Sequence, residues 1–229
     1  MIFAAGLGTR LKPLTDTMPK ALVRVGGQPL LWHVIMKLKA AGYERMVVNV
    51  HHFADQIIDY LQSNDHFGID IRISDERDGL LETGGGIKKA LPLFDPESPI
   101  LIHNVDILSN LDLNALPTDA PLLVVSPRQT KRYLLFDESF RLQGWTNIET
   151  GEVKGRMAEK RLAFSGIHVF HPSLIPLMAD WPDRFPIMDF YLKACGDHLI
   201  RGYDARDLRL LDVGKLDTLE QAEIFIKQL

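Results

Sequence analysis

The chain has 229 residues, of which 46% are hydrophobic and 24% charged, and its formal net charge is −4 at pH 7. This length suits one α/β domain of generous size or two small ones, and the composition is ordinary for a soluble protein. The slight negative charge disfavours a nucleic-acid partner, because such partners usually require a basic surface. No apolar run approaches the roughly 20 residues of a membrane span, so no membrane partner is expected.

The compartment is predicted from the single cysteine and from the N-terminus. Cys195 has no second cysteine with which to form an internal disulfide, and a reducing cytoplasm is the simplest environment for it. The first residues lack the basic region and the small-residue cleavage site of a signal peptide. We therefore expect a cytoplasmic protein.

The first stretch of the chain is an apolar run that two glycines break. Residues 1–5 are typical of a buried strand, and Gly6 and Gly8 turn it into a loop. Glycines let backbone N–H groups turn toward a bound anion and let a phosphate approach closely. The basic residues nearby are Arg10, Lys12 and Lys20. From these residues alone, a polyphosphate-binding loop and an ordinary strand-to-loop turn with solvated basic residues are both open interpretations.

Two better-known phosphate motifs do not fit this loop. The Walker motif requires a lysine after its last glycine, and here Thr9 follows Gly8. The dinucleotide motif G-x-G-x-x-G requires a third glycine where this chain has Leu11. This difference disfavours a nicotinamide-binding oxidoreductase.

Strand and helix patterns alternate after the loop. Residues 30–41 have helical spacing between Pro29 and Gly42, residues that are common at the two ends of a helix. The next expected elements are a strand at 46–50, a helix at 54–61 and a strand at 69–73. This alternation predicts an α/β fold with a mixed, mainly parallel sheet and helices on both faces.

A second glycine-rich stretch covers residues 78–91. Three consecutive glycines, Gly84–Gly86, stand between an expected strand and an expected helix at 87–91. Glycine here allows close backbone approach to a flat or anionic ligand. A flexible linker is the alternative, but a linker would not run straight into an amphipathic helix.

An apolar strand at 99–106 ends in Asp106. An acid at the end of a central parallel strand points into the ligand crevice, where Mg²⁺ bridging phosphates would sit. A helix N-cap or a turn aspartate is the alternative interpretation of this residue.

The pattern changes in the second half of the chain. A fifth parallel-type strand is expected at 122–126, and segments 133–136 and 142–145 predict an antiparallel hairpin, followed by an exposed loop at 150–155. The remaining expected elements are strands at 163–170 and 199–204 and helices at 187–194 and 218–229. Because no Pro/Gly/Ser-rich linker divides the chain, we expect a small inserted lobe within one domain that covers residues 1–229.

Several of these stretches, in this order, resemble the signature of the sugar-1-phosphate nucleotidyltransferases. The matching segments are Ala4-Ala-Gly-Leu-Gly-Thr-Arg-Leu11, Pro19-Lys-Ala-Leu-Val23, Glu82-Thr-Gly-Gly-Gly86, the strand end at Asp106, Ser165-Gly166 and Leu210-Leu-Asp-Val-Gly214. The resemblance covers essentially the whole chain and implies the fold of nucleotide-diphospho-sugar transferases.

The resemblance implies a role for each matching residue. The first loop would wrap a nucleoside triphosphate through Ala5, Gly6, Gly8 and Thr9, and the base would lie against Thr83, Gly84 and Gly85. Arg10 would hold the leaving phosphates, and Lys20 the α-phosphate or the incoming sugar phosphate. The sugar would lie on Ser165 and Gly166. For the sugar phosphate, Lys154, Lys160 and Arg161 are all candidates, their spacing does not choose between them, and solvated surface charge is the alternative for each.

The resemblance also implies that Asp106 and Asp212 are the ligands of Mg²⁺. Two carboxylates distant in sequence suit this hard cation, which prefers oxygen ligands and retains some waters. Val105 departs from the family pattern, which has glycine before the first aspartate.

The implied activity is Mg²⁺-dependent transfer of a nucleotidyl group from a nucleoside triphosphate to a sugar 1-phosphate. The motifs are closest to the branch of N-acetylmuramate-1-phosphate uridylyltransferases and mannose-1-phosphate guanylyltransferases, which favours UTP first and GTP next. Thymidylyl or cytidylyl transfer stays open. A non-catalytic nucleotide-sugar-binding regulatory module is the alternative from another class, although such a module has no need of both metal carboxylates.

Overall fold

The computed structural model describes residues 1–229, which divide into two compact units. The first unit comprises Met1–Leu80, His103–Ala115 and Arg209–Leu229, and the second comprises Leu81–Ile102 and Leu116–Leu208. Along the chain, the second unit is therefore inserted into the first. That all 229 residues behave as one domain stays a prediction.

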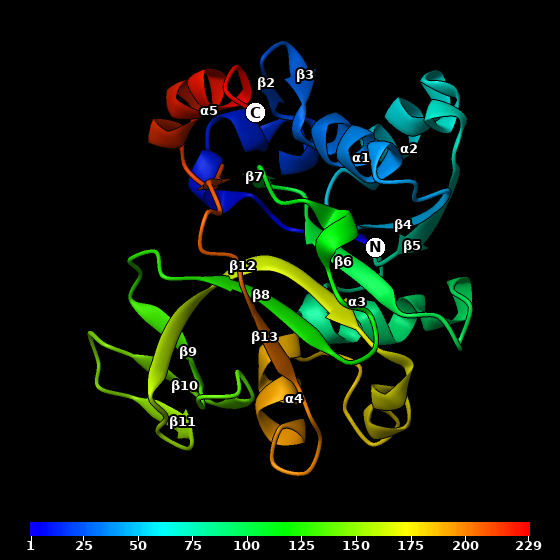
Figure 1. Cartoon of the computed structure of the whole chain (residues 1–229). Helices are drawn as coiled ribbons and strands as arrows, with labels where there is room; N and C mark the ends of the chain where they lie inside the picture. The colour runs from blue at the N-terminus through cyan, green and yellow to red at the C-terminus, as the bar shows by residue number, and fades with distance from the viewer. The chain divides into compact units, whose positions relative to one another are not determined.

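The first unit contains a parallel sheet with the strand order β6-β1-β4-β5, to which β6 contributes its last two residues, His103 and Asn104. Figure 1 labels β4, β5 and β6. Ile2 of β1 pairs with Val48 on one side and with His103 on the other. From β1, the strand order proceeds in one direction to β4 and β5, whereas β6 lies on the opposite side of β1. The loops that follow β1 and β6 therefore leave from neighbouring strand ends. Open α/β sheets bind ligands where the strand order changes direction in this way. These strands are β1 (Ile2–Phe3), β4 (Arg45–Val50), β5 (Asp70–Asp75) and β6 (Ile100–Asn104).

Three α-helices belong to the first unit: α1 (Leu30–Ala40), α2 (Ala54–Ser63) and α5 (Leu219–Ile226). Helix α1 follows Pro29 and buries Leu30, Leu31, Val34, Ile35 and Leu38, which recur at helical spacing. The three helices predicted at these places are confirmed, with their ends shifted by up to a few residues.

Two short antiparallel pairs in the first unit were not predicted. One is β2 (Arg24–Val25) with β3 (Gln28–Pro29), and the other is β7 (Ile107–Ser109) with β14 (Leu210–Asp212). The strand predicted to run to Asp106 ends at Asn104, and the chain turns there before it enters β7. The β7–β14 pair joins the segment after Asp106 to a segment about a hundred residues later.

The second unit is largely antiparallel, with the strand order β11-β10-β9-β12-β8-β13. The long strand β12 (Lys160–Phe170) pairs with β9 through its first residues and with β8 through its later residues. The elements of this unit are α3 (Glu82–Ala90), α4 (Ile187–Ala194), β8 (Leu122–Ser126), β9 (Arg132–Phe136), β10 (Leu142–Asn147), β11 (Val153–Gly155), β12 (Lys160–Phe170) and β13 (Arg201–Asp204).

The second unit confirms the predicted β9–β10 hairpin and corrects three details. Strand β8 runs parallel to β13 but antiparallel to β12, so its description as a parallel-type strand holds on one edge only. The loop predicted at 150–155 contains the edge strand β11, which was too short to recognise from its pattern. The glycines of α3 lie inside the helix, which begins at Glu82 and not at residue 87.

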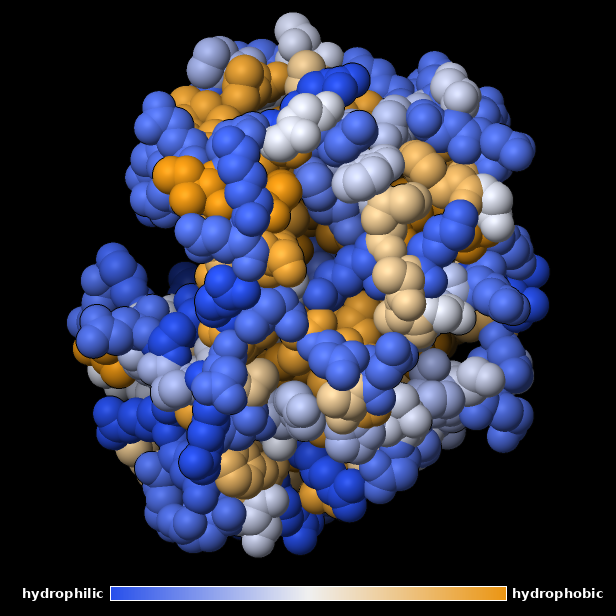
Figure 2. All heavy atoms as spheres, turned by 45° about the horizontal axis from the view of Figure 1, so that its top comes forward, coloured by the Kyte–Doolittle hydropathy of each residue, from blue (hydrophilic) through white to orange (hydrophobic).

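Eight large hydrophobic side chains are exposed. On the face that Figure 2 shows, hydrophobic residues are interspersed among hydrophilic ones. The large exposed hydrophobic side chains are Leu7, Leu14, Ile148, Val153, Met157, Leu216, Ile224 and Leu229. None of the helices combines the length and the apolar character that crossing a membrane requires.

Candidate active site

The loop after β1 is shaped by one glycine in a left-handed conformation. Gly8 has φ 64° and ψ 21°, and its carbonyl accepts hydrogen bonds from Leu11 N (2.9 Å) and Thr15 Oγ1 (2.8 Å). A Cβ at Gly8 would lie 2.9 Å from Thr15 Cγ2 and 3.1 Å from Lys20 Cβ. Glycine is therefore required here both for the backbone angle and for the space beside Lys20.

The start of this loop is fixed by a buried asparagine that sequence analysis did not single out. Asn49 Oδ1 accepts hydrogen bonds from the backbone N–H groups of Ala4 (2.7 Å) and Ala5 (3.3 Å). Its Nδ2 donates to Glu76 Oε1 at 2.8 Å. A polar residue within the apolar run of β4 was the only available signal.

Lys20 and Asp106, 86 positions apart in sequence, form an ion pair between Nζ and Oδ2. The side chains are only 11% and 19% exposed. Lys20 begins a short 3₁₀ helix, Lys20–Leu22, and Asp106 lies in the turn between β6 and β7. Because the pair is shielded from water, its electrostatic interaction is stronger than that of a surface pair.

Asp212 lies next to Asp106 through the β7–β14 ladder. Asp212 pairs with Ile107, and the N–H of Val213 donates to the carbonyl of Asp106 at 2.9 Å. The two aspartates predicted to bind a metal are thus on neighbouring backbone segments of one unit.

Arg10 reaches the same place from the loop after β1. A Cβ on Gly214 would lie 2.7 Å from Asp212 Oδ1 and 2.9 Å from Arg10 Nη2. The absence of a side chain at Gly214 therefore leaves the space in which the guanidinium and the carboxylate approach each other.

The first unit thus brings together all four charged residues that the signature singled out, Arg10, Lys20, Asp106 and Asp212. No cluster of three or more histidine, cysteine or acidic side chains is arranged to hold a metal ion. A cation at this place would therefore have two carboxylates at most, as is usual for Mg²⁺ that also binds phosphates and water.

A histidine close to these residues stays neutral at pH 7. Burial lowers the pKa of His103 to about 4. Its Nδ1 is 2.8 Å from the carbonyl oxygen of Asn104, and the side chain is fully buried. His103 is therefore a part of the core and not a general base.

The predicted base-binding residues lie in the second unit and have partners within it. The N–H groups of Gly84 and Gly85 both donate to the carbonyl of Phe185, at 2.8 and 3.2 Å. Thr83 Oγ1 accepts a hydrogen bond from Ile187 N at 2.9 Å. A Cβ on Gly84 would lie 2.2 Å from the Phe185 ring, so this glycine admits a neighbouring segment of the chain.

The predicted sugar-binding residues lie at an irregularity of β12. Gly166 has φ 79°, and the register between β12 and β8 shifts between Phe164 and His168. Ser165 is buried, and its Oγ accepts a hydrogen bond from Ile167 N at 3.3 Å.

Two of the three candidate sugar-phosphate cations have acidic neighbours. Lys154 Nζ is 3.1 Å from Asp189 Oδ1 and lies 5.6 Å from the centre of the Trp145 ring. Lys160 Nζ is 2.8 Å from Glu138 Oε2. Arg161 is exposed.

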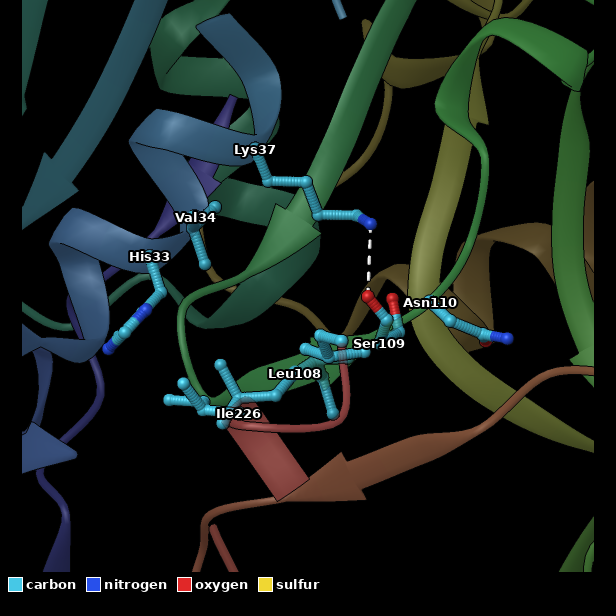
Figure 3. Close-up of a pocket in the computed structure, with 9 residues that line it drawn as sticks. His33, Val34, Lys37, Leu108, Ser109, Asn110 and Ile226 are labelled. Carbon is cyan, nitrogen blue, oxygen red and sulfur yellow. Dashed lines mark hydrogen bonds between the residues drawn. The ribbon is translucent and has the colours of Figure 1, made fainter. Parts of the chain in front are cut away.

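A cavity of about 370 Å³ also lies in the first unit, but the four charged residues do not line it. Figure 3 shows Lys37 extending from α1 toward β7, where its Nζ donates to the carbonyl of Ser109 at 3.0 Å. Burial lowers the pKa of Lys37. The cavity borders β7 beyond Asp106 and is distinct from the residues that the signature singled out.

Comparisons with known proteins decide the family. A sequence model described as nucleotidyl transferase matches residues 1–120. The chain is 35% identical over 217 residues to the N-acetylmuramate alpha-1-phosphate uridylyltransferase of Caulobacter vibrioides, covering 88% of this chain and 86% of that protein. This chain belongs to the nucleotidyl transferase family. A second nucleotidyl transferase, the N-acetylmuramate alpha-1-phosphate uridylyltransferase of Neisseria meningitidis serogroup B, is 37% identical over 183 residues, or 76% of this chain and 75% of that protein.

The predicted fold class is confirmed by a solved structure. The apo form of a UDP-glucose pyrophosphorylase superimposes with a TM-score of 0.79, covering 100% of this nucleotidyl transferase and 98% of that chain. At 16% identity, this likeness shows the fold alone.

Proposed function

We propose that this enzyme transfers the uridylyl group of UTP to N-acetylmuramate 1-phosphate and releases pyrophosphate. The observation that carries this proposal is the 35% identity to a relative of that name over 88% of the chain. The gathering of two cations and two carboxylates in the first unit supports it, because transfer between phosphates requires both charge neutralisation and alignment. We place the reaction in the cytoplasm.

In this reaction a phosphate oxygen of the sugar 1-phosphate attacks the α-phosphorus of UTP. A bond forms between these two atoms, and the bond from the α-phosphorus to the oxygen that bridges it to the β-phosphorus breaks. Pyrophosphate leaves with the electron pair of that bond. The nucleophile is already an anion, so no general base is needed, and the ring of His103 is fully buried.

Arg10 and Lys20 hold the reacting phosphates in this proposal. Arg10, at the end of the glycine loop, binds the leaving phosphates, while Lys20 binds the α-phosphate or the incoming sugar phosphate. The loop residues Ala5, Gly6, Gly8 and Thr9 surround the triphosphate. Preorganised charges aimed at the phosphates lower the barrier because they need no rearrangement during the reaction.

Asp106 and Asp212 would hold the divalent cation, which we propose to be Mg²⁺. Their oxygens suit this ion, and the β7–β14 ladder places their backbones side by side. The ion pair with Lys20 uses Oδ2 of Asp106, so the lysine also holds that carboxylate in place. When bound, the cation neutralises the negative charge of the phosphates.

Five residues carry the base and sugar contacts in this proposal. Thr83, Gly84 and Gly85 contact the base, and Ser165 and Gly166 contact the sugar. Because the N–H groups of both glycines donate to Phe185, contact through these glycines would use other atoms. For the sugar phosphate, Lys154, Lys160 and Arg161 all stay candidates, because Lys154 and Lys160 each have an acidic partner and an aromatic ring nearby, so their surroundings do not distinguish them.

A pyrophosphate-release assay tests the proposal. The purified enzyme is mixed with UTP, GTP, CTP, ATP or dTTP, each with N-acetylmuramate 1-phosphate, mannose 1-phosphate or glucose 1-phosphate, in the presence of MgCl₂. We expect the highest kcat/KM for UTP with N-acetylmuramate 1-phosphate. Faster turnover of GTP with mannose 1-phosphate would instead assign the guanylyl branch, and no turnover of any pair would indicate a non-catalytic module.

A further inference from the structure

The glycine loop is anchored by a pair of buried polar side chains, one in β4 and the other just after β5. Asn49 lies in β4, and Glu76 directly follows β5. Asn49 is 3% exposed and Glu76 is 0% exposed. Burial of a carboxylate is costly unless hydrogen bonds compensate for the lost water, so such a residue in a core needs a reason.

The position of Asn49 explains what its side chain does. In the β1–β4 ladder Asn49 is paired with Phe3, the last residue of β1. The next two N–H groups of the chain, those of Ala4 and Ala5, donate to Asn49 Oδ1. The Asn49 side chain therefore accepts the hydrogen bonds of the backbone just beyond the end of the β1–β4 pairing. In this way it sets the direction in which the backbone enters Gly6–Gly8.

Glu76 determines how the asparagine amide is turned. An amide side chain has one donor end and one acceptor end, whereas an ionised carboxylate is only an acceptor. Glu76 Oε1 accepts from Asn49 Nδ2 at 2.8 Å, which leaves Asn49 Oδ1 facing Ala4 and Ala5. The backbone N–H of Glu76 donates to the carbonyl of Val50 at 2.8 Å, so the backbone that carries this side chain is held to β4.

We infer that Asn49 and Glu76 are positioning residues that hold the glycine loop in its triphosphate-binding shape. This inference rests on the proposed function, because it assigns the loop to the triphosphate. Neither side chain contacts the reacting atoms: Asn49 acts through the backbone of Ala4 and Ala5, and Glu76 acts through Asn49.

An exchange of the two functional groups tests the inference. The variant Asn49→Asp keeps an acceptor for Ala4 and Ala5 but sets a second carboxylate against Glu76. The double variant Asn49→Asp with Glu76→Gln restores a donor–acceptor match, with the carboxylate at position 49 and the amide at position 76. The single variant Glu76→Gln measures what the remaining contacts of that side chain contribute. Ser74→Ala is the matched control, because Ser74 is buried opposite Asn49 in the β4–β5 register and its Oγ has no hydrogen-bond partner.

Four quantities are measured for each variant: kcat and KM in the pyrophosphate-release assay, the Kd for UTP with MgCl₂ by calorimetry, and the free energy of unfolding in urea. For Asn49→Asp we expect kcat/KM to fall on the order of 10- to 100-fold and UTP affinity to fall with it, because a displaced loop misaligns the phosphates. The double variant should recover most of both losses, and Ser74→Ala should match the wild type.

Two results would overturn the inference while leaving the proposed function in place. One is wild-type kcat/KM and UTP affinity in folded Asn49→Asp. The other is a double variant that recovers the free energy of unfolding but neither kcat/KM nor UTP affinity, which would mean that the pair serves stability alone. If the wild-type enzyme neither binds UTP nor releases pyrophosphate with any substrate pair, the proposed function itself is wrong, and the inference is wrong with it.

Discussion

Lys20 and Asp106 are the residues whose interaction is most informative about the site. They pair across 86 positions of sequence, and both side chains are largely shielded from water. Each charge helps to hold the other in place, so removing one changes both the charge and the geometry at the proposed phosphate site.

We predict that Lys20→Ala and Asp106→Ala each lower turnover by a factor on the order of 10² to 10³. The physical reason is the loss of a preorganised charge where negative charge shifts during transfer. Pyrophosphate release at saturating substrates measures this loss, and circular dichroism checks that each variant is folded.

The control for these variants is Arg45→Ala. Arg45 also belongs to an ion pair, with Asp70 at 3.2 Å, but that pair is exposed and outside the site. Surface ion pairs contribute little, so Arg45→Ala should keep wild-type turnover. Near-normal turnover in Lys20→Ala or Asp106→Ala would contradict the roles assigned to them.

Gly8 permits a second prediction with a close control. Gly8 and Gly27 both have positive φ, at 64° and 78°, but only at Gly8 would a Cβ meet neighbours, among them Lys20 Cβ at 3.1 Å. Alanine at either position should lower the free energy of unfolding by about 1–2 kcal/mol, because the left-handed conformation is strained for a residue with a Cβ. Only Gly8→Ala should also lower kcat/KM, since it displaces Lys20. Equal kcat/KM in the two variants would show that the loop does not depend on this space.

At the scale of single residues, the sequence predicted the charged residues of the site better than the residues that hold them in position. Arg10, Lys20, Asp106 and Asp212 stand in recognisable motifs, and the structure brings them together. Asn49 was not predicted, because one polar residue in an apolar strand does not reveal which backbone groups it meets.

At the scale of elements, the well-patterned segments were predicted and the short ones were not. Helix α4 and strand β8 have the predicted bounds, because the buried residues of α4 recur at helical spacing and β8 is a short continuous apolar run. Strands β2, β3, β7 and β14 have two or three residues each, too few to show a period. Their partners decide their structure, and for β7 that partner is β14, about a hundred residues away.

The three glycines of α3 show a different limit of the sequence. Their run predicted a loop, since glycine is a poor helix former. In the structure Gly84 and Gly85 are in the helix, where the ring of Phe185 and the backbone of Asp183 occupy the space of the missing side chains. The helix is stabilised by packing that only the folded chain reveals.

The contact between β12 and α4 leads to a prediction about pH. His168 of β12 and Tyr191 of α4 are both buried, and Nδ1 and the hydroxyl group are 2.7 Å apart. Burial lowers the pKa of His168 to about 3, so the folded protein keeps this ring neutral where an unfolded chain would protonate it. The unfolded state therefore binds more protons below pH 6.5, the ordinary histidine value, and stability should fall as the pH decreases from there toward about 3.

Urea unfolding at pH 7 and at pH 5 measures this effect. We expect His168 to account for a loss of about 1 kcal/mol per pH unit below its ordinary pKa. His168→Gln keeps a group able to bond to Tyr191 but does not titrate, so its stability should fall less between the two values. His52→Gln, at an exposed ring, should fall as much as the wild type. The same acid sensitivity in His168→Gln as in the wild type would refute this assignment.

At the scale of the whole molecule, the site depends on a fold that brings separate segments of the chain together. The first unit is assembled from three separate segments, and each supplies at least one of the charged residues. Arg10 and Lys20 come from the first segment, Asp106 from the second and Asp212 from the third. The proposed activity therefore requires the folded unit and does not reside in any one motif.

Treatment with a chelator tests whether the activity depends on a divalent cation. Treatment with EDTA should abolish pyrophosphate release, and added MgCl₂ should restore it, because two carboxylates and the phosphates need a cation between them. Asp212→Asn should raise the MgCl₂ concentration needed for half-maximal turnover. Full turnover in excess EDTA would contradict the assignment of both aspartates.

The most direct test of the central claim is kcat/KM for pyrophosphate release from UTP and N-acetylmuramate 1-phosphate in the wild type, Asp106→Asn and Asp212→Asn. We predict turnover by the wild type and a fall on the order of 10² to 10³ in each variant, with folding retained. Wild-type turnover in both variants, or no turnover by the wild type with any nucleotide and sugar 1-phosphate, would contradict it.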